Sequence, residues 1–107
     1  MATITRGPAD NYVESIKHCL EKYELEHPGA DAALYRQNSG SVRVRIVDDR
    51  FAKLDISKRH DAVWAFLTSE LPDDTVQEIS ILLLLAPGEE KSSFMNLEFD
   101  DPLPSRL

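Results

Sequence analysis

The sequence predicts a single small α+β domain in the order helix, hairpin, helix, strand, with a mixed three-stranded sheet and its helices on one face. Three observations predict this class: two segments with apolar residues at helical spacing, an alternating apolar and basic segment after a turn cluster, and one nearly continuous apolar run. The 107 residues suit one domain, and 42% hydrophobic residues supply a modest core without disulfides or metal.

The first helix is predicted over residues 11–26. Asn11 followed three residues later by Glu14 is typical of a capping box, in which each side chain satisfies a free N–H of the first turn. The sequence at 27–29, His-Pro-Gly, ends the pattern. Apolar residues recur at helical spacing at Tyr12, Ile16, Cys19, Leu20 and Tyr23. We therefore interpret the single cysteine, Cys19, as a small core residue.

A β-hairpin is predicted next, with strands at 34–36 and 41–47. The intervening Gln-Asn-Ser-Gly cluster at 37–40 contains residues that tolerate positive φ and therefore suits a hairpin loop. In the second strand, apolar residues alternate with Ser41, Arg43 and Arg45. One face of this strand is therefore expected to be apolar and the other basic.

The second helix is predicted over residues 58–71, after a turn and a short helical piece around 51–54. Ser57 is expected to cap it. The stripe that should face the core consists of His60, Val63, Trp64, Leu67 and Leu71.

The run at 76–85 is apolar nearly throughout, and its length and flanking turn residues favour a central strand buried on both faces. Met95, Leu97 and Phe99 alternate with polar residues and predict a further short strand. We expect an N-terminal arm at 1–9, the domain at 10–99, and an acidic, proline-containing tail at 100–107. Residues 102–107 of this tail should be removable without loss of folding.

Charge and cysteine content restrict the function classes. The formal net charge is −7, although residues 36–60 hold seven Lys and Arg against three Asp and Glu. An acidic domain is a poor duplex binder, because phosphate neutralisation supplies most of the affinity for duplex nucleic acid. The start lacks a signal-peptide pattern, and the longest apolar run is far shorter than a membrane span. A cytoplasmic protein is therefore expected.

Catalytic motifs are not recognisable in the sequence. There is no Gly-x-Ser-x-Gly nucleophile elbow, and the four glycines are isolated, which excludes a glycine-rich phosphate loop. The chain is therefore expected to be a binding or adaptor module and not an enzyme.

Several residues give the chain a resemblance to a known family. The pattern F-x7-R-H-x2-V-x3-L is matched without a gap by Phe51, Arg59, His60, Val63 and Leu67. The predicted order of strands, turn and helix around these residues also agrees with this pattern. In this pattern the chain resembles the BolA family, whose fold is like that of type II KH domains. The resemblance covers about residues 42–90.

The resemblance implies a partner and a cofactor. BolA-like proteins pair with monothiol glutaredoxins and share a [2Fe–2S] cluster, and His60 matches the helix histidine that the resemblance assigns as a ligand. The second implied ligand, a His or Cys in the first hairpin loop, is absent from residues 35–41, and Lys53 and Gln77 stand where the family usually has Gly and His. The alternative interpretation of His60 is a partly buried structural residue with one nitrogen on a backbone oxygen.

Partner contacts are predicted at basic residues. A second alternative is a BolA-like fold without a cluster that docks an unknown protein through its basic strand face and acidic tail. A third is weak binding of single-stranded nucleic acid, although residues 51–58 lack the Gly-x-x-Gly clamp of KH domains. The residues expected to contact a partner are Arg59, Arg43, Arg45 and Lys58.

Overall fold

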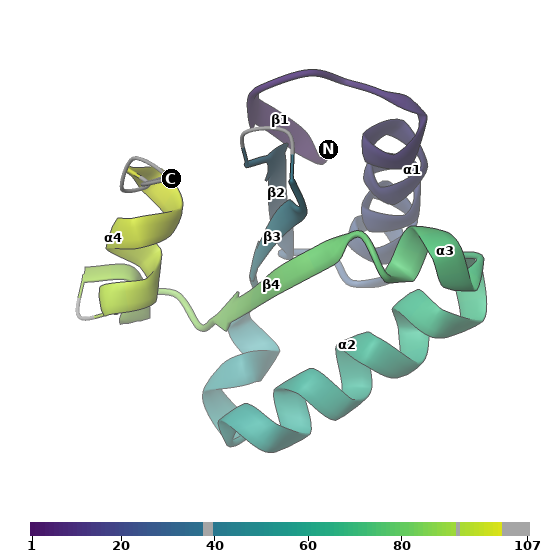
Figure 1. The fold of residues 1–107 in the computed structure, drawn as a ribbon. Helices are drawn as coiled ribbons and strands as arrows, with labels where there is room; N and C mark the ends of the chain where they lie inside the picture. Colours follow the sequence, from purple (N-terminus) through teal and green to yellow (C-terminus); the bar gives the residue numbers. More distant parts are fainter. Residues whose placement is uncertain (38–39, 92, 102–107) are drawn as a thin grey trace.

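The computed structural model describes residues 1–37, 40–91 and 93–101 (Figure 1). It is a small α+β domain with a mixed four-stranded sheet. Within those residues the elements are β1 (Thr3–Arg6), α1 (Asn11–Glu26), β2 (Asp31–Arg36), β3 (Val42–Val47), η1 (Asp49–Lys53), α2 (Ile56–Glu70), α3 (Asp73–Val76), β4 (Ile79–Leu85), η2 (Glu89–Lys91) and α4 (Phe94–Asp100). The two labels η1 and η2 denote short 3₁₀ helices.

The sheet has the strand order β1-β2-β3-β4. The predicted hairpin is confirmed, since β2 and β3 pair antiparallel with Arg36 opposite Val42 and Asp31 opposite Val47. The outer strands β1 and β4 pair parallel to β2 and β3, respectively. The prediction of three strands is wrong, because Thr3–Arg6, placed in an N-terminal arm, adds a fourth strand to the sheet.

Both long helices lie on one face of the sheet, as predicted (Figure 1). The core between them and the sheet includes Ile16 and Leu20 of α1, Val44 and Ile46 of β3, and Leu67 of α2, each with no exposed surface. Cys19 belongs to the same core, and burial raises the pKa of its thiol to about 11. The expected core position of Cys19 is therefore confirmed.

The prediction that all helices lie on one face is wrong for the C-terminal helix. Residues 95–99, predicted as a strand, form part of α4, which covers the opposite face of the sheet (Figure 1). Ser93 caps this helix by accepting a hydrogen bond from the Asn96 N–H. Met95, Leu97 and Phe99 alternate with polar residues in the sequence, which suggests a strand. In the helix, however, Met95 and Phe99 lie about one turn apart, and Leu97 is 63% exposed.

The apolar run at 76–85 is only partly the strand that was predicted. Its first residues end the short helix α3, and β4 begins at Ile79. The prediction of a central position is also wrong, since β4 lies at the edge of the sheet and pairs with β3 alone among the described strands. Its leucines are nevertheless covered on both faces, by α2 on one side and α4 on the other.

Two predicted helix caps are displaced. Asp10, and not Asn11, caps α1 by accepting from the Val13 N–H. Asp55, and not Ser57, caps α2 by accepting from the Lys58 N–H. Carboxylates at these positions also interact favourably with the helix dipole. The part of the predicted tail at 102–107 lies outside the described residues.

Candidate functional site

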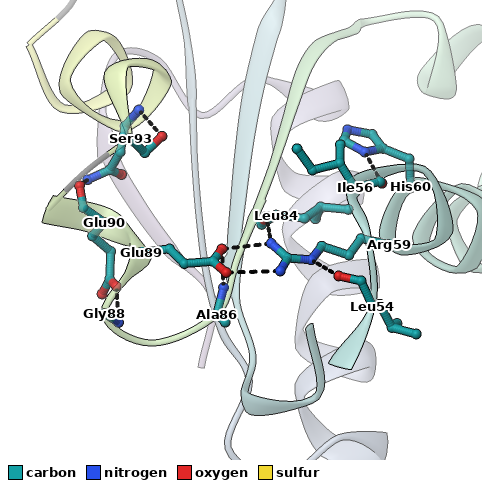
Figure 2. A network of polar contacts seen from close by, with 11 residues as sticks. Leu54, Ile56, Arg59, His60, Leu84, Ala86, Gly88, Glu89, Glu90 and Ser93 are labelled. Carbon is teal, nitrogen blue, oxygen red and sulfur yellow. Dashed lines mark hydrogen bonds and ion pairs between the residues drawn. The ribbon is translucent and has the colours of Figure 1, made fainter. Parts of the chain in front are cut away.

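The Arg59-His60 pair lies in the second turn of α2, beside the edge of β4 (Figure 2). Asp48 at the end of β3 donates its N–H to the Leu85 carbonyl, so alternate residues Leu82 and Leu84 direct their carbonyls away from β3. These two carbonyls would be open hydrogen-bond acceptors along a free sheet edge. Arg59 contacts the Leu84 carbonyl, and His60 contacts the Leu82 carbonyl.

Arg59 is the centre of a polar network that joins three elements. Its guanidinium donates to the Leu54 carbonyl at 3.0 Å and to the Leu84 carbonyl at 3.1 Å. It also forms a bidentate pair with the two Glu89 carboxylate oxygens, at 2.7 and 2.9 Å (Figure 2). The network therefore connects α2 and β4 to η2, the turn that leads toward α4.

Glu89 is held by a backbone donor as well as by the arginine. Its carboxylate accepts from the Ala86 N–H at 3.0 Å. The hydrogen bonds from Arg59, and next that from Ala86, lower the pKa of Glu89 to about 2. The same pairing raises the pKa of the Arg59 guanidinium. No local sequence signal pairs Glu89 with Arg59, which lies 30 positions earlier in the chain.

His60 has both ring nitrogens close to backbone oxygens. Nδ1 lies 2.9 Å from the Ile56 carbonyl and Nε2 lies 2.8 Å from the Leu82 carbonyl. A neutral imidazole can donate to one of these oxygens, whereas a doubly protonated ring donates to both. The arrangement makes His60 a cross-link between the first turn of α2 and the edge of β4.

A groove of about 890 Å³ runs along this edge of β4 between the start of α2 and the start of α4. Exposed apolar side chains border it, since Ile56 is 69% exposed and Met95 is 43% exposed. His60 and Glu89 contribute polar groups to its wall. This groove is the candidate site, because it places the most distinctive sequence motif beside exposed apolar surface.

The fit of a [2Fe–2S] cluster can be tested on the donors that line this groove. A nitrogen ligand must present a lone pair, but both His60 nitrogens are directed at carbonyl oxygens. The ring would have to leave one carbonyl to bind iron. In the described part of the chain, no group of three or more His, Cys, Asp or Glu residues has the geometry of a metal site. As arranged, these residues do not fit a cluster, and ligation by His60 stays a prediction.

The four residues predicted to contact a partner do not form one surface. Arg59 is paired with Glu89 beside β4, and Lys58 lies on the exposed side of α2. Arg43 and Arg45 point to the opposite face of the sheet, where α4 covers them. The structure therefore offers no continuous strip of these cations for a nucleic-acid backbone, and contacts of the four residues with a partner stay a prediction.

A second buried network was not recognisable from the sequence. Arg36 at the end of β2 donates to both Asp10 oxygens at 2.6 and 3.2 Å and to Glu78 at 3.0 Å. These bonds join the N-cap of α1 to the segment before β4. They lower the pKa of Asp10, chiefly through the hydrogen bond from Arg36. The role of this network is structural, because its arginine is buried and fully engaged.

Comparison of the chain with protein families, with curated proteins and with solved structures finds no match. Within the described residues, no helix is both long and apolar enough to cross a membrane.

Proposed function

We propose that this chain is a small protein-interaction module whose partner docks in the groove beside β4. The observation that carries the proposal is the position of the Arg59-His60 pair, which lies beside the exposed side chains of Ile56 and Met95. Exposed apolar groups bordered by polar ones are typical of protein-binding surfaces. Because β4 is already covered along its open edge, the partner binds through side chains and not by adding a strand.

The partner that the resemblance implies is a monothiol glutaredoxin. Support comes from the element order between α1 and β4, which contains the helix, strand, strand, short helix, helix and strand on which the resemblance rests. The short helix α3 is inserted before the last strand. In this proposal Arg59 and His60 hold the edge of β4 in place, and the docked protein contacts the apolar rim.

Cluster sharing is a second candidate function, and one observation favours it. His60 is only partly buried and lines the groove, so a docked thiolate-bearing protein would reach its ring. The cost is one of its two contacts with backbone carbonyls, worth about 1 kcal/mol for an ordinary hydrogen bond. Docking without ligation by His60 is the form that the geometry supports better.

Binding can be measured by titrating the chain with a monothiol glutaredoxin in the cluster-free form. We expect a complex that Ile56→Asp weakens at least tenfold, because the substitution places a charge on the apolar rim. Ile56 begins α2, where an acidic residue is compatible with the helix, so folding should be retained. Leu25→Asp is the matched control, since Leu25 is 83% exposed on α1 and does not line the groove.

His60→Ala separates the two forms of the proposal. If His60 is structural, the variant loses about 1–2 kcal/mol of stability because the link between the first turn of α2 and the edge of β4 is removed, and the absorption spectrum of a cluster-loaded mixture stays unchanged. A changed spectrum would instead establish cluster sharing. His18→Ala, at an exposed position on α1, is the control. Absence of binding to glutaredoxin in both the cluster-free and the cluster-loaded form would overturn the proposed partner.

A further inference from the structure

The sheet face opposite α1 and α2 carries three arginines from two strands. Arg6 comes from β1, and Arg43 and Arg45 come from β3, where they alternate with the apolar residues that face the core. Tyr35 of β2 lies between them, with Arg6 stacked 5.1 Å from the centre of its ring. This arginine face is therefore a basic surface with an aromatic floor.

The helix α4 is seated on the arginine face through charged and polar contacts. Arg43 donates to Glu98 at 2.8 Å, and Arg45 donates to both Asp100 and Asn96 at 2.7 Å. Arg6 donates to the Asp100 carbonyl. Each arginine of the face therefore binds an oxygen of one seven-residue helix.

The aromatic side chain of Phe99 anchors the helix between these contacts. Phe99 is 2% exposed and meets the Tyr35 ring edge-on, with their centroids 4.8 Å apart. The Tyr35 hydroxyl donates to the Phe99 carbonyl at 2.7 Å, and the Arg45 guanidinium lies 4.8 Å from the Phe99 ring centre. The face thus recognises the tripeptide Glu98-Phe99-Asp100, an aromatic residue between two carboxylates.

The length of α4 makes its helical state dependent on this face. Helices shorter than about 12–15 residues are marginal in water on their own. Two other apolar side chains of the helix contribute little burial, since Leu97 is largely exposed and Met95 partly so. The helix therefore resembles a short peptide ligand of the arginine face that is part of the same chain.

We propose that the arginine face is a docking site for an acidic helix of a partner protein that carries an aromatic residue between two carboxylates, and that α4 occupies it in cis until such a helix replaces it. The charge of the face fits this occupant, because Arg43 and Arg45 would meet the two carboxylates and the ring, while Arg6 would meet a backbone carbonyl. The inference does not depend on glutaredoxin binding, although Met95 of α4 also borders the groove beside β4, so release of α4 would change that groove.

The test uses the full chain and a labelled peptide, SFMNLEFDD, that copies residues 93–101. Phe99→Ala in the chain removes the anchor and opens the face, so fluorescence anisotropy should show at least tenfold tighter peptide binding than to the unchanged chain. The reason is competition, since attached α4 has an effective concentration near the millimolar range. The same peptide with its Phe99 changed to Ala should not bind either chain.

A second variant in which α4 is released is needed in case Phe99→Ala unfolds the chain. The two variants are called the opened chains. Glu98→Gln combined with Asp100→Asn removes the charges of α4 without creating a cavity, and this chain should also bind the native peptide more tightly. Leu97→Ala is the matched control on α4, because its side chain is exposed and its removal should leave the face closed. Binding to both opened chains should weaken as salt is raised.

A second peptide tests whether the arginine face binds any helix that carries the Glu-Phe-Asp tripeptide, or only the sequence of α4. An alanine-rich helix that retains only the Glu-Phe-Asp tripeptide should bind the opened chains as well. Failure of this peptide, or equal peptide affinity for opened and unchanged chains that are both folded, would overturn the proposal. Dimerisation of the unchanged chain by exchange of α4 between copies would also overturn it, since the occupant would then be a second copy.

Discussion

The two faces of the sheet hold their helices in different ways. On one face, α1 and α2 bury continuous apolar surface against β2, β3 and β4. On the other face, α4 packs on the small cluster of Ala33, Tyr35 and Phe99, and its other described contacts include ion pairs and polar hydrogen bonds. Burial of a continuous apolar core is cooperative across the domain, whereas a short helix held by one small apolar cluster and by polar contacts can open locally.

This difference implies two levels of stability in one small domain. The α1 and α2 face should open only with global unfolding, because its side chains pack against each other across three strands. The α4 face should open separately, because a short segment can leave while the core stays closed. Function that needs a movable element is therefore expected on the α4 face.

The largest predicted effect is at Leu67, which has no exposed surface at the centre of the α1 and α2 core. Leu67→Ala should lower the free energy of unfolding by about 2–5 kcal/mol, because it removes buried methyl groups and leaves a cavity. Phe99→Ala removes a larger side chain, yet we expect a smaller global loss, because only α4 is released. Urea unfolding followed by circular dichroism measures both changes.

Hydrogen exchange provides the control for this pair of variants. In Phe99→Ala, amide protection should fall within α4 and remain in β3, whereas in Leu67→Ala it should fall throughout. Equal global losses in the two variants would show that the sheet has one cooperative core on both faces. A loss below about 0.5 kcal/mol at Leu67 would mean that the packing of α2 is not as described.

The core face could be predicted from the sequence because its signals are local and periodic. Residues 11–26 match α1, and the alternation around Arg43 and Arg45 located β3. Buried residues Val63 and Leu67 had the spacing of a helix face. In each of these segments, the periodicity of the element and the direction of burial agree, so the pattern has one interpretation.

The α4 face could not be predicted because its determinants are spread along the chain. The helix is too short for its period to be distinguished from a strand, and its ion pairs join Arg43 to Glu98 across 55 positions. The strand β1 is shorter still, with four residues of which only Ile4 is apolar. At the groove, the Arg59-His60 pair was recognised, but its contacts with β4 depend on a fold that places the strand at the sheet edge.

Removal of the Tyr35 hydroxyl tests how the arginine face holds α4 while the aromatic ring of residue 35 stays in place. Tyr35→Phe eliminates the bond to the Phe99 carbonyl and the bond that the hydroxyl accepts from Arg43, and it leaves the ring contact. Stability should fall by about 0.5–1.5 kcal/mol for each bond, the usual range for one hydrogen bond. The loss should appear as faster amide exchange in α4. Tyr12→Phe, at an exposed position on α1, is the control and should change neither quantity. An unchanged exchange rate in α4 would mean that the Tyr35 hydroxyl does not hold the helix.

The smallest predicted effect concerns the Arg59–Glu89 pair, which links the core face to the turn before α4. The folded-state pKa of Glu89 is lowered to about 2, chiefly by the hydrogen bonds from Arg59, from an ordinary value of 4.5. A lowered carboxyl pKa means that the unfolded chain binds the proton more readily. The stability that the pair contributes is therefore complete above pH 4.5 and is lost as the pH falls from 4.5 toward 2. Because the Glu89 side chain is 40% exposed, solvent screening should keep the contribution below about 1 kcal/mol.

Glu89→Gln should accordingly make the decline of stability between pH 4.5 and 2 less steep than in the unchanged chain. Some decline should remain, because the pKa values of Asp10 and Asp48 are also lowered, the former chiefly by Arg36 and the latter by hydrogen bonds from Arg50 that outweigh its burial. Thermal unfolding at a series of pH values measures the slope. In an Arg59→Gln background, Glu89→Gln should change that slope less than in the native background, because the main partner that lowers the pKa is gone and only the Ala86 N–H remains. An identical slope with and without Glu89 in the native background would mean that the pair is open to solvent for most of the time, and that the turn before α4 is not fastened to the core face.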